Sequence, residues 1–172
     1  MPSVSTVYLG AGSDLRAVNE LFVMSGLGPI VTEQPDQQIV ALYADGELVG
    51  ALHACAPVVV AYSLVQAGMG VEEAAEAAGR IQAIEALAVA REHRGAGYGA
   101  LLIDKASEHA RVQFFSETLL AKIDGSDPEL IDWYARRGFS VCAPGQALQV
   151  NGVSLPLSPE HRDAWKSLST DS

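Results

Sequence analysis

The sequence has few of the features that mark a secreted, disulfide-linked or membrane-spanning protein. Only two cysteines, Cys55 and Cys142, occur in 172 residues. Their spacing matches no metal-binding motif, so we expect both to be reduced, small apolar residues without a catalytic role, and we expect no metal site. No stretch approaches the roughly 18 uninterrupted apolar residues of a membrane helix, and no basic segment followed by a long apolar run opens the sequence. We therefore expect a cytoplasmic protein without a membrane partner.

Basic residues are scarce, and this scarcity restricts the partners that the protein can have. Lysine and arginine number 11 against 21 aspartate and glutamate residues, which gives a formal net charge of −10. Because nucleic acids and anionic membrane surfaces are negatively charged, they would be repelled overall, and we expect no nucleic acid partner. An acidic surface suits a cationic amine, although the need for solubility explains such a charge equally well.

Aromatic residues are also few, at 6%, whereas apolar residues make up 49% of the chain. This composition is typical of an Ala/Val/Leu-rich protein of helices and strands and not of a disordered chain. A length of 172 residues is enough to bury one core. We therefore expect residues 1–172 to form a single domain.

The most informative stretch runs from Glu85 to Leu102. An apolar segment over 81–90 predicts a strand, a glycine-rich turn follows, and apolar residues at helical spacing predict a helix over 97–112. Glycines leave backbone N–H groups free to point at one anion, and a helix N-terminus adds unpaired donors and partial positive charge. With Arg94 beside it, the turn is typical of a phosphate or pyrophosphate site.

Other phosphate-binding motifs fit this turn less well. A Walker A loop ends in Gly-Lys-Ser or Gly-Lys-Thr, where this chain has Gly99 and Ala100. The Rossmann fingerprint matches residues 95–100 formally, but it also needs an acidic residue at the end of the next strand, about 20 residues on. Glu117 has that distance but precedes the predicted strand, and Asp124 is too far along the chain. A P-loop is therefore excluded, and a Rossmann site is a weak alternative.

Two motifs resemble the GNAT superfamily of N-acetyltransferases. Its Q/R-x-x-G-x-G/A motif is similar to residues 94–99 (RGAGYG), and the apolar strand before that motif resembles residues 87–89. Downstream, a family helix ends in an aromatic residue, a tyrosine, three variable residues and Gly-Phe, which residues 133–139 (WYARRGF) resemble. The two motifs occur in the right order, one helix and one strand apart. The resemblance covers residues 81–141.

The resemblance implies an α/β (α+β) fold: a mixed, mostly antiparallel sheet with a central parallel strand-helix-strand unit and flanking helices. Local patterns predict strands over 4–10, 39–44, 47–54 and 118–124, and a helix over 15–25. Two dipeptides, Asp45-Gly46 and Asn151-Gly152, are typical of hairpin turns. Asp127 followed by Pro128 is typical of a helix start.

Two segments lie outside this pattern. Residues 57–80 hold an apolar run, a glycine break and an Ala/Glu helix, and they look like an insertion before the central strand. They either cover the sheet or form a lid or wall of the acceptor pocket. Residues 159–172 are expected to form a polar tail. Residues 29–37 are expected to form a loop, in the part of the chain where the resemblance places acceptor-contacting segments.

The resemblance implies acetyl-coenzyme A, or coenzyme A, as the cofactor. In the family, the strand before the glycine turn bulges and splays from its parallel neighbour, which frees backbone groups for the pantetheine arm; here these belong to Leu87 and Val89. Asp127 stands where the family often has asparagine, which keeps the helix cap but removes an amide donor to the pantetheine. The residues expected to hold the pyrophosphate are Arg94, Gly95, Ala96, Gly97, Gly99 and Ala100.

Tyr134 matches the tyrosine with which the family protonates the departing thiolate. A phenol with an ordinary pKa of about 10 can donate a proton or a hydrogen bond to sulfur at neutral pH. The structural alternative is a core tyrosine on an amphipathic helix.

Glu85 is the candidate base that neutralises the amine. Residues 85, 87 and 89 are expected on one face of the strand, which would bring the carboxylate near the acetyl end of the cofactor. Several family members have a carboxylate two residues earlier, where this chain has Ala83, and others use a chain of waters. A strand glutamate that faces solvent or an arginine is the structural alternative, and His53 and His93 are further candidate bases.

We therefore expect an acetyl-coenzyme A-dependent N-acetyltransferase that acts on a primary amine of a small molecule or peptide. The alternative is a non-catalytic module that binds coenzyme A as a sensor or interaction domain. Tyr134 beside an intact glycine turn favours the enzyme, because binding alone needs only the turn. The edge-prone residues 146–157 and the habit of the family predict a homodimer through the C-terminal strands.

Overall fold

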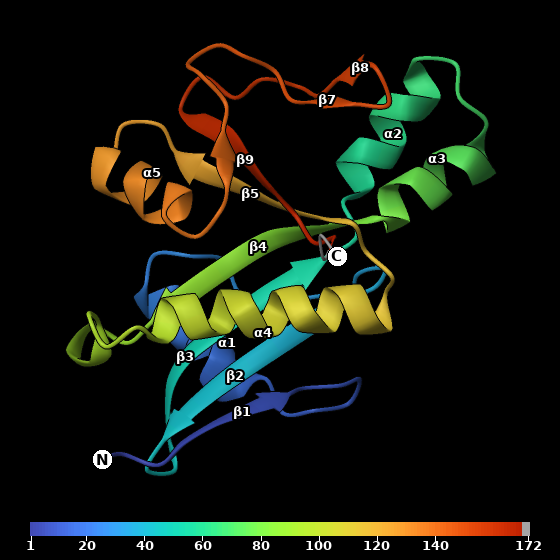
Figure 1. Cartoon of the computed structure of the whole chain (residues 1–172). Coiled ribbons are helices and arrows are strands. Elements are labelled where there is room, and N and C mark those ends of the chain that lie inside the picture. The colour runs from blue at the N-terminus through green and yellow to red at the C-terminus, as the bar shows by residue number, and fades with distance from the viewer. Residues whose placement is uncertain (170–172) are drawn as a thin grey trace.

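The computed structural model describes residues 1–169, and its body is a seven-stranded sheet (Figure 1). The strands lie in the order β1-β2-β3-β4-β5-β9-β6, and every pair is antiparallel except β4 and β5. This confirms the predicted mixed sheet with its central parallel unit. The strands are β1 (Val4–Tyr8), β2 (Gln38–Ala44), β3 (Glu47–Cys55), β4 (Ile81–Val89), β5 (Thr118–Asp124), β6 (Ser140–Val141) and β9 (His161–Ser167).

Helices cover both faces of the sheet (Figure 1). The predicted apolar face of α4 (Tyr98–Gln113) is confirmed, since Leu102, Ile103, Ala106 and Ala110 are all fully buried. On the other face, Val18 and Phe22 of α1 pack against alanines of β3 and β4.

No helix within residues 1–169 has the length and apolarity to cross a membrane. The helices are α1 (Arg16–Met24), α2 (Val58–Gln66), α3 (Val71–Gly79), α4 (Tyr98–Gln113), α5 (Pro128–Ala135) and a 3-10 turn, η1 (Arg91–His93).

Local sequence signals position several elements as predicted. Asp45 and Gly46 join β2 to β3 with φ values of 51° and 85°, as a type I′ turn requires. Asn151 and Gly152 do the same between β7 (Gln149–Val150) and β8 (Val153–Ser154), which form a separate two-stranded sheet. Asp127 caps α5, because its Oδ1 accepts a hydrogen bond of 3.0 Å from the backbone N–H of Leu130.

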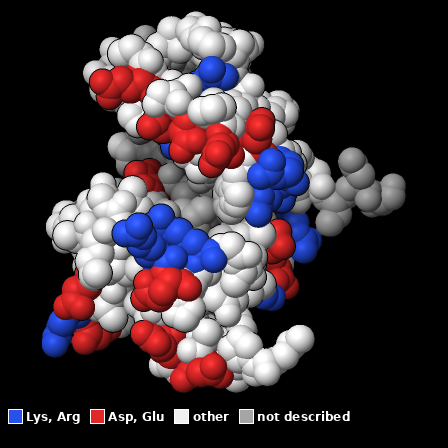
Figure 2. All heavy atoms as spheres, turned by 90° about the vertical axis from the view of Figure 1, so that its left-hand side faces the viewer, with Lys and Arg blue, Asp and Glu red and all other residues white. Residues whose placement is uncertain are grey.

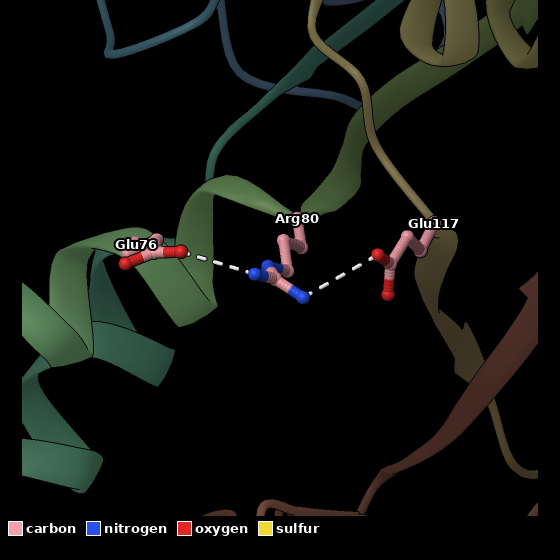
Figure 3. A network of polar contacts seen from close by, with 3 residues as sticks. All are labelled: Glu76, Arg80 and Glu117. Atoms are coloured by element: carbon pink, nitrogen blue, oxygen red, sulfur yellow. Dashed lines mark hydrogen bonds and ion pairs between the residues drawn. The ribbon is translucent and has the colours of Figure 1, made fainter.

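The segment 57–80 forms the helix pair α2 and α3, which packs over the first residues of β4 and β5. Arg80, the residue after α3, contacts Glu76 at 3.0 Å and Glu117 at 3.5 Å (Figure 3). All three side chains are more than half exposed, so each ion pair contributes at most about 1 kcal/mol. The backbone carbonyl of Arg80 also accepts hydrogen bonds from Glu117 and Thr118, which joins the end of α3 to the start of β5.

The expectation of a polar tail over 159–172 is wrong for most of that segment. Residues 161–167 form β9, which lies between β5 and β6 in the sheet and buries Ala164 completely. The sequence of β9 (HRDAWKS) has little strand propensity, and its pairing with two neighbouring strands decides its structure. The remainder of the predicted tail, residues 170–172, lies outside the described residues.

The apolar residues of the segment that was expected to form a dimer edge, 146–157, pack within the protein itself. Leu155 is buried, and Leu148, Val150 and Val153 pack against the same apolar cluster beneath α2 and α3. The homodimer stays a prediction.

Candidate active site

The two parallel strands at the centre of the sheet separate partway along their length. Pairing between β4 and β5 runs from Ile81 with Thr118 to Ile84 with Ala121 and then ends. At the same point the register between β4 and β3 shifts, since His53 pairs with Ala86 and the next residue, Ala54, pairs with Ile84. Glu85 is therefore the extra residue of a β-bulge. The resemblance implied both the bulge and the splayed strands, and the structure has both.

The bulge also changes which residues of β4 share a face. Leu87 and Val89 pack with the cluster beneath α4, whereas Ala86 and Ala88 pack beneath α1. Glu85 lies on the face of Cys55, whose thiol it contacts, and not on the face of Leu87. The expectation that residues 85, 87 and 89 share one face is therefore wrong, because the inserted residue reverses the alternation of side chains.

The backbone of β4 beyond the bulge faces the gap between the strands. The N–H of Ala90 donates to Val49 on the β3 side, so by alternation Leu87 and Val89 direct their N–H and C=O groups away from β3. One of these groups is already occupied, since the carbonyl of Val89 accepts a hydrogen bond of 3.1 Å from Nε of Arg94. The backbone groups of Leu87 and the N–H of Val89 are therefore left to meet a ligand.

A cavity of about 600 Å³ occupies the gap and reaches both faces of the sheet. Ser25 and Leu27 line it on the α1 side, and Trp133 on the α5 side. Most of the predicted site residues come together here, and the remaining four follow Arg94 in the adjacent turn. The predicted residues that line this first cavity are Glu85, Leu87, Val89, Arg94, Gly99, Asp127 and Tyr134.

The glycine turn offers a row of backbone donors. Gly95 and Gly97 adopt φ values of 82° and 83°, a conformation that other residues rarely take, and Gly97 is the N-cap of α4. Among residues 95–100, no backbone N–H makes a short, well-aligned hydrogen bond to another atom of the described residues, and the first N–H that does is that of Leu101, to Gly97. A row of backbone donors without a strong internal partner, at the start of a 16-residue helix, fits a phosphate or pyrophosphate.

The charge near the turn supports this fit. Arg91 and Arg94 are both exposed there, although the chain as a whole carries an excess of acidic residues. Figure 2 views the molecule from this side and shows a hollow between two lobes, with basic atoms gathered on the lower rim and acidic atoms on the rim above. An anion in the hollow would therefore have basic neighbours on the lower rim.

Trp133 is a site residue that sequence reasoning did not select. A Cβ atom on Gly99 would come within 2.9 Å of Cζ2 of Trp133, so any larger residue at this position would force the indole to shift. The guanidinium of Arg137 stacks on the Trp133 ring, 3.7 Å from its centroid, and its Nη1 donates to the carbonyl of Trp133. The tryptophan belongs to the same motif as Tyr134, and that adjacency is the signal that could have identified it.

Tyr134 is held rigidly at the wall of the first cavity. Its ring packs edge to face with Trp133 at 5.0 Å and Phe139 at 5.1 Å between centroids, and the residue is only 6% exposed. Burial raises the pKa of Tyr134 to about 12. Its hydroxyl hydrogen-bonds to no other atom of residues 1–169, so a protonated phenol is free to act on a ligand.

A second cavity, of about 870 Å³, adjoins the first. The two share residues at the point where the central strands separate, including Ile84, Glu85, Lys122 and His161. The thiol of Cys55 donates to Oε1 of Glu85 across 3.8 Å, and the pKa of this thiol is raised to about 12 by burial and then by the nearby carboxylate. Glu85 therefore stands at the junction of the two cavities.

The two histidines named as alternative bases have different positions. His53 lines the second cavity, with Nε2 3.1 Å from Oε1 of Gln37, and burial lowers the pKa of its imidazole. His93 lies in η1 and lines neither cavity. His161, at the start of β9, lines both cavities. The sequence did not indicate His161, because residues 159–172 were expected to form a tail. Among residues 1–169, no three His, Cys, Asp or Glu side chains form a group suited to a metal ion.

Solved structures similar to this chain include three acetyltransferases. The ribosomal-protein-S18-alanine N-acetyltransferase from Escherichia coli matches with a TM-score of 0.65 and 11% identity, over 99% of this chain and 97% of that chain. A spermidine N-acetyltransferase variant from Vibrio cholerae matches with a TM-score of 0.63 and 13% identity, over 96% and 94%. Nourseothricin acetyltransferase matches with a TM-score of 0.61 and 19% identity, over 96% and 99%. At these identities the likeness establishes the fold.

The sequence itself shows the family. None of the curated proteins matches it significantly. The model of the acetyltransferase (GNAT) family, however, matches residues 18–139, a span that runs from α1 through β4, the glycine turn and α5 to Phe139. This match covers well over half of the chain and includes both motifs and most of the residues of the first cavity. The chain therefore belongs to the acetyltransferase (GNAT) family.

Proposed function

We propose that the protein is an acetyl-coenzyme A-dependent N-acetyltransferase that transfers an acetyl group directly to the primary amine of a small molecule. The observation that carries the proposal is the junction of the two cavities at Glu85, because Arg94 and Gly99 of the glycine turn line one cavity and the loop after α1 and the start of α2 line the other. Membership of the family supports the reaction class. The second cavity has the volume of a small-molecule site, typically about 300–1,000 Å³.

Acetyl-coenzyme A, when bound, supplies an acetyl group that is activated as a thioester. The free N–H groups of residues 95–100 and the positive end of α4 would hold its pyrophosphate. The backbone groups of Leu87 and the N–H of Val89 would hold the pantetheine arm along β4. Asp127 also lines this path, but its Oδ1 already accepts from Leu130, so its carboxylate can only accept a further hydrogen bond from the ligand.

The proton movements fall to Glu85 and Tyr134. The carboxylate of Glu85 would take a proton from the ammonium group of the acceptor, directly or through one water. The neutral amine nitrogen would then form the new C–N bond, the C–S bond would break, and the nitrogen would lose its second proton to solvent, which leaves a neutral amide. The hydroxyl of Tyr134 gives its proton to the departing sulfur and is reprotonated from solvent. Because burial raises the pKa of Tyr134 to about 12, the phenol carries that proton throughout the neutral range.

The test is a turnover assay with the purified protein. We would add acetyl-coenzyme A and a panel of primary amines, follow the release of the coenzyme A thiol with time, and identify the acetylated amine by mass. We expect sustained release with at least one amine. Tight binding of coenzyme A in calorimetry, without release on any amine, would overturn the proposal in favour of a non-catalytic binding module.

A further inference from the structure

The second cavity has walls of aliphatic side chains supplied by two separate segments. The loop that follows α1 contributes one part of the lining, and the residues around the start of α2 contribute another. No aromatic side chain of the described residues lines the space apart from the two imidazoles of His53 and His161. The apolar lining consists of Leu27, Pro29, Ile30, Val31, Ala56, Pro57, Val58, Val59, Ala83, Ile84, Leu120 and Ala121.

The charged side chains that line this cavity are few. Glu85 is the acidic one and Lys122 the basic one among the described residues, and both lie at the junction with the first cavity. The remaining polar lining comes from Thr32, Gln34, Ser158 and the two histidines. The cavity therefore offers a single carboxylate to a cationic ligand, at the end where acetyl transfer would occur.

Three aliphatic side chains that line this cavity, those of Val31, Val58 and Val59, are largely exposed, and we call them the apolar rim. Val60 and Leu64 anchor α2 in the core and are fully buried, whereas Val58 and Val59 are 59% and 45% exposed at its first turn. Val31 in the facing loop is 81% exposed. Aliphatic side chains left exposed on both sides of an opening gain stabilisation only when something apolar covers them.

We infer that the acceptor is a monoamine with an apolar body, whose amino group lies at Glu85 and whose body lies against the aliphatic walls of the second cavity. This inference rests on the proposed function. A polyamine would place a second ammonium group among aliphatic side chains, away from Glu85 and without a second carboxylate. An unpaired cation in such surroundings loses hydration without compensation, whereas an alkyl or aromatic body gains from burial.

The experiment uses two acceptors of equal length that differ in one charge. Hexylamine and hexane-1,6-diamine would be compared as kcat/KM values at saturating acetyl-coenzyme A, with spermidine as a third acceptor. We expect hexylamine to be preferred by at least roughly tenfold, which corresponds to about 1.4 kcal/mol of transition-state binding. A preference for hexane-1,6-diamine or spermidine would overturn the inference and leave the proposed acetyltransferase intact. If none of the amines supported release of coenzyme A, both the inference and the proposed function would be wrong.

A pair of variants tests whether the rim causes the preference. Val58→Asp adds a carboxylate at the first residue of α2, where an acidic residue also suits the helix. Val71→Asp makes the same change at the first residue of α3, which is 71% exposed and lines neither cavity of the site. We expect Val58→Asp to reduce the preference for hexylamine several-fold and Val71→Asp to keep the parent ratio.

A third variant replaces Val58→Asp if that variant does not fold. If thermal unfolding shows that Val58→Asp is not folded, Val31→Asp in the exposed facing loop makes the same test. An unchanged ratio of the two kcat/KM values in the folded rim variant would contradict the inference, because the rim would then not contact the acceptor.

Discussion

The thiol of Cys55 lies 3.8 Å from Oε1 of Glu85, where the two cavities meet. Because the pKa of the thiol is raised to about 12, Cys55 keeps its proton and acts as a donor toward the carboxylate. Glu85 is the bulge residue of β4, so its backbone is displaced from the regular strand while its side chain is held from one side. This arrangement leaves the second carboxylate oxygen for an acceptor amine.

Replacement of Glu85 by glutamine tests its role as the base. Glu85→Gln keeps the shape of the side chain but cannot accept a proton, so we expect kcat to fall by about 10²-fold at neutral pH and to recover partly at high pH, where the amine is already neutral. The measurement is a pH-rate profile at saturating acceptor, with Glu72→Gln on the exposed side of α3 as the control. A profile parallel to that of the parent protein would leave Glu85 as a structural carboxylate.

Removal of the Tyr134 hydroxyl tests its role as the acid that protonates the departing thiolate. Tyr134→Phe keeps the ring contacts with Trp133 and Phe139, so the fold and the affinity for acetyl-coenzyme A should change little. We expect turnover to fall by about 10²- to 10⁴-fold, without the recovery at high pH that Glu85→Gln shows. Calorimetry and steady-state kinetics on the same preparation separate binding from chemistry. A variant with the parent rate would remove the acid assignment.

A negative charge in the glycine turn should weaken cofactor binding. The sequence alone suggests Gly97→Glu, but Gly97 has a φ of 83°, where a side chain adds backbone strain. Ala96 is exposed and has no such conformation, so Ala96→Glu adds the charge without that strain. We expect at least a tenfold loss of affinity for coenzyme A in calorimetry, roughly 1.4 kcal/mol or more.

The matched control for the turn variant is Ala75→Glu, which makes the same change of charge on the exposed side of α3. It should bind coenzyme A as the parent protein does. Equal affinities of Ala96→Glu and Ala75→Glu would show that the pyrophosphate does not bind at the turn.

The contact between Gly99 and Trp133 predicts a loss of stability on a minimal substitution. Gly99→Ala would bring a methyl group within 2.9 Å of the indole, and relief of that overlap should cost about 1–3 kcal/mol of unfolding free energy. Gly79→Ala in α3 has its nearest neighbour at 3.9 Å and a helical backbone, so it should be neutral or stabilising by up to about 1 kcal/mol. Urea unfolding of both variants measures the difference, and equal midpoints would contradict the expectation.

Burial of Tyr134 predicts a loss of stability in alkali. Its pKa is about 12 in the folded protein against an ordinary value of 10.0, so the folded state binds this proton more tightly than the unfolded state. The resulting stability is present below pH 10 and is lost as the pH rises toward about 12. We expect the urea midpoint of the parent protein to fall more steeply above pH 10 than that of Tyr134→Phe. Parallel curves would show that the phenol titrates normally.

The sequence by itself determined the features that depend on a few adjacent residues. Asp45-Gly46 and Asn151-Gly152 specify their turns because few residues tolerate positive φ, and Asp127 specifies a helix start because its carboxylate reaches the N–H of Leu130. The glycine turn and the buried face of α4 were predictable for the same reason, because each depends on the spacing of residues within one element. The resemblance to a known family added the bulge and the separation of the central strands.

Only the tertiary structure decided how distant segments meet. It placed the polar segment 161–167 in the sheet as β9 and so brought His161 to the site, because hydrogen bonding to β5 and β6 outweighs weak strand propensity. It moved Glu85 to the face of Cys55, because a single bulge residue reverses the alternation on which a sequence pattern relies. The walls of the second cavity come from segments about 30 residues apart, and only packing over the sheet sets their distance.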